Sequence, residues 1–166
     1  MQIREIQMDD AEAFLLLQKK LDEETSYMLL EPGERNTEVA GILKRIQDVM
    51  AQENRTIRVV EVNGELVGYI ELVGGNVHRN RHTAYIVVGI RSNNRGMGLG
   101  TQLFTKGEAW ARCHGIHRLE LTVMVHNHAA IALYKKMGFH IEGTKRHSLK
   151  VDGQYVDEYY MAKLLD

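Results

Sequence analysis

Apolar and polar residues alternate in two adjacent stretches near the middle of the chain, Thr56–Val62 and Glu65–Val73, which Asn63-Gly64 separates. A period of two is typical of half-buried β-strands, and Asn-Gly favours a tight hairpin turn because both residues tolerate positive φ. The pattern predicts a β-hairpin. The next stretch, Thr83–Ile90, is almost continuously apolar, which predicts a strand near the centre of a sheet.

Helical periodicity marks four other segments. We expect helices from Ala11 onward, from Thr37 to Gln52, after the glycines that end at Gly100, and from Ala129 to Met137. The inner face of the second helix is predicted to carry Val39, Ile42, Leu43, Ile46 and Met50. One face of the third is marked by Leu99, Leu103, Gly107 and Trp110, and Gly115 is its expected stop.

The remaining strands are weaker signals. Ile6 and Met8 suggest a short first strand, and Arg118–Val125 alternates well enough to be another. Phe139–Lys150 and Gln154–Leu164 are predicted to pair around the turn at Asp152-Gly153. The order is therefore mixed α/β, with antiparallel hairpins in the middle and at the C-terminus and helical crossovers in the second half.

Composition narrows the function classes. With 166 residues, a formal charge of −1 and no run of Lys or Arg, we expect one domain and no role in nucleic-acid binding. The polar start and the lack of a long apolar run lead us to expect no signal peptide, no membrane segment and a cytoplasmic location. Cys113 is the single cysteine, which excludes an internal disulfide, and we expect its thiol to be buried.

The segment Arg95-Gly96-Met97-Gly98-Leu99-Gly100 joins the apolar strand to the third helix. Glycines can take positive φ and bring backbone N–H groups close to an anion, and the helix that follows adds its unpaired first-turn amides. The P-loop pattern is excluded because no lysine precedes Thr101. The alternate spacing of the glycines also disfavours the Gly-x-Gly-x-x-Gly fingerprint of a nicotinamide dinucleotide, although that ligand and an unliganded turn stay open.

Two motifs in order resemble the GNAT superfamily of acyl-CoA-dependent N-acyltransferases. The first is Arg95–Gly100, and the second is Asn127–Phe139, with its Leu-Tyr at Tyr134 and its Gly-Phe. The resemblance is strong from about residue 83 to 143. It implies one N-acetyltransferase domain over residues 1–166. It also implies a mixed, mainly antiparallel central sheet of about six to seven strands with about four helices, whose central strands splay apart to form the acyl-CoA cleft.

The resemblance also assigns expected roles to residues. The CoA pyrophosphate would lie on Arg95, Gly96, Met97, Gly98, Leu99, Gly100 and Thr101, with Lys136 or Lys135 near the nucleotide phosphates. The pantetheine arm would run beside Val88 and Ile90, with a bulge at Gly89, and the Val88 amide would polarise the thioester carbonyl. Tyr134 would give a proton to the leaving thiolate. Asn127 would hold the pantetheine or a water, or cap the helix after it.

The general base stays open among four residues on or beside strands: Glu71, His82, Tyr85 and Glu120. The histidine pairs His126/His128 and His114/His117 have no complementary ligands at metal spacing, so we expect no metal. The first connection is rich in acidic residues, which favours a cationic acceptor such as a polyamine, an aminoglycoside-like amine or a basic peptide N-terminus, unless they form only a solvated loop. They are Asp22, Glu23, Glu24, Glu31 and Glu34. A second polar and aromatic patch comprises Asp157, Glu158, Tyr159 and Tyr160.

The function predicted from the sequence is therefore transfer of an acetyl group from acetyl-CoA to a primary amine, by direct attack in a ternary complex. A family-level homodimer is also expected. Two alternatives remain: an acyl-CoA sensor that binds without turnover, and a nicotinamide-dependent oxidoreductase, which the glycine spacing disfavours.

Overall fold

The computed structural model describes residues 1–166 and contains eleven main elements in mixed order. In chain order these are β1 (Gln2–Glu5), α1 (Ala11–Glu24), α2 (Val39–Ala51), β2 (Arg55–Val62), β3 (Glu65–Gly74), β4 (Thr83–Ile90), α3 (Leu99–Cys113), β5 (Arg118–Met124), α4 (His128–Lys136), β6 (His140–Val151) and β7 (Gln154–Leu164). Three short 3₁₀ turns lie between them: η1 (Met8–Asp10), η2 (His78–Asn80) and η3 (Ser92–Asn94).

The strands form one seven-stranded sheet in the order β1-β2-β3-β4-β5-β7-β6. Every neighbouring pair is antiparallel except β4 and β5, which are parallel. This confirms the predicted mainly antiparallel sheet with four helices. The parallel pair is possible because α3 connects β4 to β5 as a crossover.

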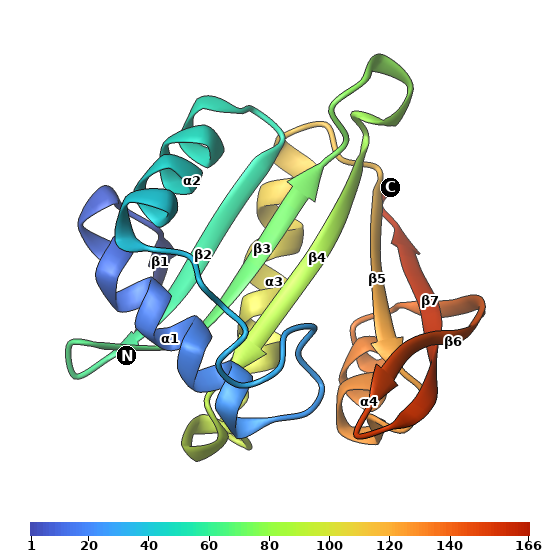
Figure 1. Ribbon diagram of the computed structural model, residues 1–166. Coiled ribbons are helices and arrows are strands. Elements are labelled where there is room, and N and C mark those ends of the chain that lie inside the picture. Colours follow the sequence, from blue (N-terminus) through green and yellow to red (C-terminus); the bar gives the residue numbers. More distant parts are fainter.

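Helices cover both faces of the sheet, with α1 and α2 on one side and α3 and α4 on the other (Figure 1). Each face has its own apolar core. Phe14 and Ile46 pack against the sheet on the α1/α2 face, whereas Leu103 and Ile131 do so on the α3/α4 face. Gly107 lets α3 approach β3, because a Cβ there would lie 3.2 Å from Leu72 Cδ1. The two-sided burial explains why β4 is nearly continuous in apolar residues.

The central hairpin has the predicted form. Asn63 and Gly64 have φ of 51° and 79°, the left-handed conformation that a tight hairpin turn needs. Strands β2 and β3 pair on either side of this turn, with Val62 opposite Glu65. The bounds of β4 are also those predicted.

The predicted first strand is wrong. Strand β1 lies earlier, at Gln2–Glu5, and Met8 begins the turn η1. The Asp10 carboxylate causes this turn: it accepts a hydrogen bond from the Gln7 amide at 2.7 Å and two from the Arg4 guanidinium at 2.8 Å. A polar contact between residues six apart therefore outweighs the local alternation.

Two predictions of burial are also wrong. On α2 the buried residues are Ile42, Ile46 and Val49, whereas Val39 and Met50 are exposed, because the helix is rotated relative to the predicted face. Cys113, expected to be buried, is exposed in the last turn of α3, since Trp110 and Ala111 take the inward positions there.

Candidate active site

The loop between β4 and α3 presents a row of unused backbone amides. Gly96 and Gly98 have φ of 75° and 76°, and Gly98 is the N-cap of α3. The first amide to bond back is that of Gln102, which donates to the Gly98 carbonyl at 3.1 Å. The amides of residues 96–101 have no partner within the chain, and no acidic side chain occupies the first turn of α3. This arrangement suits an anion such as a phosphate.

Gly100 has a different role from the other two glycines. It does not take positive φ, contrary to the expectation for all three, because it already belongs to the first turn of α3. A Cβ at this position would lie 2.7 Å from Leu133 Cδ2, on α4. Its small size therefore lets α3 and α4 pack closely beside the anion site.

Cationic side chains lie around these amides. Arg95 is exposed at the start of the loop. Lys136 extends from the end of α4 to Thr101, with its Nζ donating to Thr101 Oγ1 at 3.4 Å. Lys135, the neighbour named as an alternative, makes no such contact. The structure thus brings Arg95, Thr101 and Lys136 to one end of α3.

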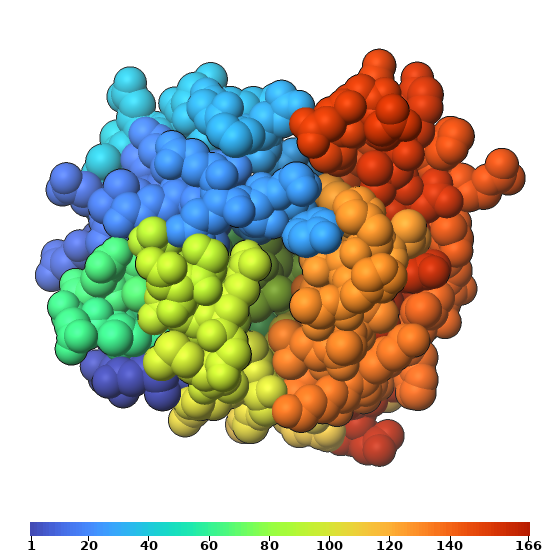
Figure 2. Space-filling view, turned by 90° about the horizontal axis from the view of Figure 1, so that it is seen from below, coloured from blue at the N-terminus to red at the C-terminus, as the bar shows by residue number.

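Strands β4 and β5 separate beside this loop. They pair at only three positions, Thr83 with Arg118, Ala84 with Leu119 and Tyr85 with Glu120. Beyond Tyr85 the two strands diverge, which confirms the predicted splayed strands. Val88 and Ile90 lie in the diverging part and are only half-buried, although β4 is central in the sheet. Figure 2 shows the resulting hollow between the β4 end (yellow-green) and the β5–α4 segment (orange).

Gly89 does not form the expected bulge. The register between β3 and β4 runs without a shift, with Gly89 directly opposite Tyr69. Instead, a Cβ at Gly89 would lie 2.8 Å from Leu21 Cδ1, so this glycine accommodates α1 against the sheet.

Tyr134 packs between aromatic rings beside the cleft. Its side chain is 8% exposed, and its ring centroid lies 5.5 Å from that of Phe104 and 6.3 Å from that of Phe139. Burial, together with the nearby Tyr85 hydroxyl, raises the pKa of Tyr134 to about 12. The phenol is therefore protonated at neutral pH and can donate a hydrogen bond or a proton.

Tyr85 makes a contact that the sequence did not reveal. Its hydroxyl lies 2.7 Å from the Thr122 hydroxyl, so a hydrogen bond links β4 to β5 just where the strands diverge. Tyr85 is 38% exposed and projects from the α1/α2 face of the sheet. Thr122 shares this face with Glu120, because alternate residues of a strand point the same way. Thr122 could therefore have been identified from the alternation of residues in this strand.

The other three base candidates are engaged elsewhere. Glu71 is 3% exposed and receives two hydrogen bonds from Arg45 Nη2, at 2.6 and 2.8 Å. Glu120 accepts from Arg118 Nε at 2.8 Å. His82 has an exposed side chain away from the cleft hydroxyls, and its carbonyl accepts from the amides that lead into β5. The carboxylates of Glu71 and Glu120 therefore already accept hydrogen bonds from arginine side chains. Tyr85 is the candidate whose hydroxyl lies at the divergence of β4 and β5, where its partner is the Thr122 hydroxyl.

Asn127 is the N-cap of α4, which confirms one of the two roles predicted for it. Its Oδ1 accepts a hydrogen bond from the Ala130 amide at 3.3 Å. This bond orients the helix that carries Tyr134. Contact with pantetheine stays a prediction.

Two of the five acidic residues noted in the first connection, Asp22 and Glu24, are paired with arginines. Asp22 lies at the end of α1 and is 1% exposed, bound by Arg35 at 2.7 and 3.1 Å. Glu24 accepts from the Ser92 amide at 2.9 Å and from Arg91. Partial burial acts to raise the pKa of Glu24, but these donors outweigh it and lower the pKa. Glu23, Glu31 and Glu34 are exposed and form no ion pair, so the acidic character of the connection rests on these three residues.

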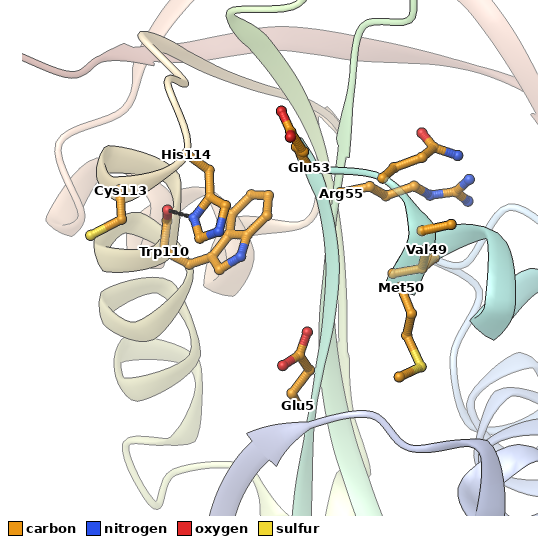
Figure 3. A pocket seen from close by; sticks show the side chains of 10 residues that line it. Glu5, Val49, Met50, Glu53, Arg55, Trp110, Cys113 and His114 are labelled. Carbon is orange, nitrogen blue, oxygen red and sulfur yellow. Dashed lines mark hydrogen bonds between the residues drawn. The ribbon is translucent and has the colours of Figure 1, made fainter.

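A groove of about 620 Å³ lies away from this cleft (Figure 3). Its walls include Trp110 from the last turn of α3, His114 directly after this helix, and Arg55 at the start of β2. The anion site is at the opposite end of α3. The groove is therefore separate from the candidate active site.

The structure contains no cluster of metal-binding side chains and no helix suited to spanning a membrane. No three His, Cys, Asp or Glu side chains cluster closely enough to hold a metal ion. None of the helices combines the length and the apolar character needed to cross a membrane.

Comparison with known proteins identifies the family. Residues 21–139 match the model of the acetyltransferase (GNAT) family, so the chain belongs to this family. The L-amino acid N-acetyltransferase AaaT of Escherichia coli K12 is 40% identical over 108 residues, which cover 62% of this chain. The match spans 64% of that relative, slightly under two thirds of its length.

Solved structures share the whole fold. The acetyltransferase of the GNAT family from Streptococcus pneumoniae has a TM-score of 0.96 and 26% identity, with 99% of each chain covered. The structure of yncA from Salmonella typhimurium, described with its cofactor acetyl-CoA, has a TM-score of 0.88 and 22% identity over all of this chain and 94% of that one. The second likeness is one of fold alone.

Proposed function

We propose that this chain transfers an acetyl group from acetyl-CoA to a primary amine by direct attack in a ternary complex. The observation that carries the proposal is the divergence of β4 and β5 directly beside the unused amides of residues 96–101. The cleft that would hold the extended arm of acetyl-CoA thus begins at a site suited to the pyrophosphate of the same molecule. Membership of the acetyltransferase family and the acetyl-CoA described for the Salmonella fold relative support this donor.

The donor is proposed to follow β4. Its pyrophosphate lies on the loop amides, with Arg95 and Lys136 supplying positive charge. Its pantetheine runs along the free edge of Val88 and Ile90, where β5 no longer pairs. This course brings the thioester to the point of divergence, near Tyr85 and Tyr134.

The chemical step follows from the groups that meet there. The amine nitrogen attacks the thioester carbonyl carbon, and the Val88 amide stabilises the negative charge that develops on the carbonyl oxygen. The carbon–sulfur bond then breaks. The departing thiolate gains a proton from the Tyr134 hydroxyl, the proton lost by the amine nitrogen passes to water, and the Tyr134 phenolate regains a proton from water before the next turnover.

Tyr85 and Thr122 orient the amine in this proposal. If the Tyr85 hydroxyl donates to Thr122 Oγ1, the lone pairs of Tyr85 Oη can accept an N–H from the neutral acceptor amine. The nitrogen lone pair is then free to face the carbonyl carbon. Tyr85 acts here as an orienting group and takes up no proton in this step.

Two measurements test the proposal. In thermal unfolding, acetyl-CoA and CoA should stabilise the chain, by about 2.7 kcal/mol at a hundred times Kd, and NAD should not. After incubation with acetyl-CoA and a panel of amines, mass spectrometry should detect an acetylated amine. Stabilisation by NAD alone would contradict the proposal, and acetyl-CoA binding without any product would favour a sensor.

A cytoplasmic location and a homodimer stay predictions. The edge strand β6 offers unpaired backbone groups along its outer side, which supports a pairing surface for a second copy. Size-exclusion chromatography with light scattering would determine the oligomeric state.

A further inference from the structure

A small pocket lies at the far end of β5, between the α1–α2 connection and the β6–β7 hairpin. Its volume is about 90 Å³. Half of its lining residues are apolar, and these come from three separate parts of the chain: Met28, Leu29, Leu30, Met124, Leu149 and Val151. Its charged lining residues, Glu31, Lys150 and Asp152, carry both signs and are all exposed.

This pocket adjoins the proposed position of the acceptor amine. Met124 follows Thr122 by two residues on the same face of β5, a separation of roughly 7 Å. The connection after α1 closes over the end of β5, where the Tyr27 and His126 rings have centroids 5.2 Å apart. In Figure 2 the blue connection meets the orange and red segments beside the hollow. A molecule whose amine reached Tyr85 and Thr122 would extend into this pocket.

The chemistry of the pocket is that of an apolar side chain. Asp22 and Glu24 are paired, with Arg35 and Arg91. The acidic residues that line the pocket itself, Glu31 and Asp152, are exposed, whereas Met124 is buried and Leu149 half-buried. The volume has room for roughly six water-sized groups, enough for a side chain of leucine or methionine size. A polyamine would place a charged or strongly hydrated group against Met124 and Leu149, which costs free energy without a partner.

We propose that this pocket receives the side chain of the acceptor, and that the preferred acceptors are primary amines with an apolar side chain of about four heavy atoms next to the amine, as in leucine or methionine. The inference rests on the proposed acetyl transfer and narrows its acceptor class.

The test compares amines with the purified full chain, following CoA thiol release under saturating acetyl-CoA. Leucine and methionine should exceed alanine in kcat/KM by roughly tenfold or more, because each buried methylene adds to binding. Lysine, aspartate and spermidine should be poorer than leucine. Equal or better turnover of spermidine or alanine would overturn the pocket while leaving acetyl transfer intact. Absence of turnover with every amine would overturn both proposals.

A matched pair of variants locates the effect. Leu149→Lys places a charge in the pocket and should raise the KM for leucine about tenfold, with the KM for acetyl-CoA unchanged. Leu164→Lys, an exposed leucine on β7 outside the pocket, should behave as the wild type. Circular dichroism confirms that both variants fold. An unchanged KM for leucine in folded Leu149→Lys would overturn the assignment. An equal rise in the KM for leucine in Leu164→Lys would also overturn the assignment.

Discussion

The Tyr85 hydroxyl lies 2.7 Å from the Thr122 hydroxyl, across the point where β4 and β5 diverge. The last backbone pair between these strands is Tyr85 with Glu120, so Thr122 is the first residue on that face of β5 without a partner on β4. The side-chain bond therefore continues the connection between the strands by one step. It also places two hydroxyls at the narrow end of the cleft.

We predict that Tyr85→Phe and Thr122→Val each lower kcat/KM for the amine. Loss of one hydrogen bond costs about 1 kcal/mol, which corresponds to roughly a fivefold to tenfold loss. The KM for acetyl-CoA should change little, because neither side chain contacts the loop of residues 96–101. Steady-state kinetics with each substrate varied in turn would measure this.

Thr122→Ser is the control for that prediction. It retains the hydroxyl and should keep at least half of the wild-type kcat/KM. If Thr122→Val were as active as Thr122→Ser, the orienting role would be wrong.

Tyr134→Phe should lower kcat about a hundredfold while leaving acetyl-CoA affinity within a factor of two or three, because proton donation acts only in the chemical step. The raised pKa of about 12 keeps the wild-type phenol protonated throughout the usual assay range. Ionisation of Tyr134 should thus produce no fall in activity between pH 7 and about pH 10. A variant that lost affinity but kept kcat would show Tyr134 to be a packing residue only.

Lys136→Met should raise the KM for acetyl-CoA several-fold, since a screened charge–phosphate contact contributes on the order of 1 kcal/mol. Lys135→Met is the matched control, because this neighbour is equally exposed and does not reach Thr101. The difference between the two should shrink at high salt. Equal effects of both substitutions would indicate general charge rather than a contact at the α3 N-terminus.

Glu24→Gln should weaken the attachment of the Arg91–Ser92 segment, just before the glycine loop, and destabilise the chain by about 1 kcal/mol at pH 7. Because the pKa of Glu24 is lowered in the folded chain, its contribution is full above its ordinary value of 4.5 and is lost as the pH falls through the folded value. Urea unfolding of both proteins should therefore show a difference at pH 7 that narrows toward pH 3.5. A difference that grew on acidification would have the wrong sign.

Local patterns sufficed for much of the fold. Asn63-Gly64 favours the left-handed backbone of a tight turn, and β4 is apolar on both faces because helices cover both, so each could be located from its own residues. The positive φ of Gly96 and Gly98 could also be predicted from the local sequence, because it is a property of the turn.

Features that depend on distant contacts were missed. The pairing of Glu71 with Arg45, from another element, turns a plausible base into half of an ion pair. A side chain at position 100 would collide with Leu133 on α4. Thr122 belongs to the candidate site because its hydroxyl bonds that of Tyr85 across the diverging strands. Periodicity carries no information about such pairs, which arise only when the elements pack.

The central claim is direct acetyl transfer within a ternary complex, and initial rates of CoA thiol release test it most directly when acetyl-CoA and leucine are both varied. We expect release that depends on the amine, saturates in both substrates and gives intersecting double-reciprocal lines. Parallel lines, or release that is independent of the amine, would contradict it.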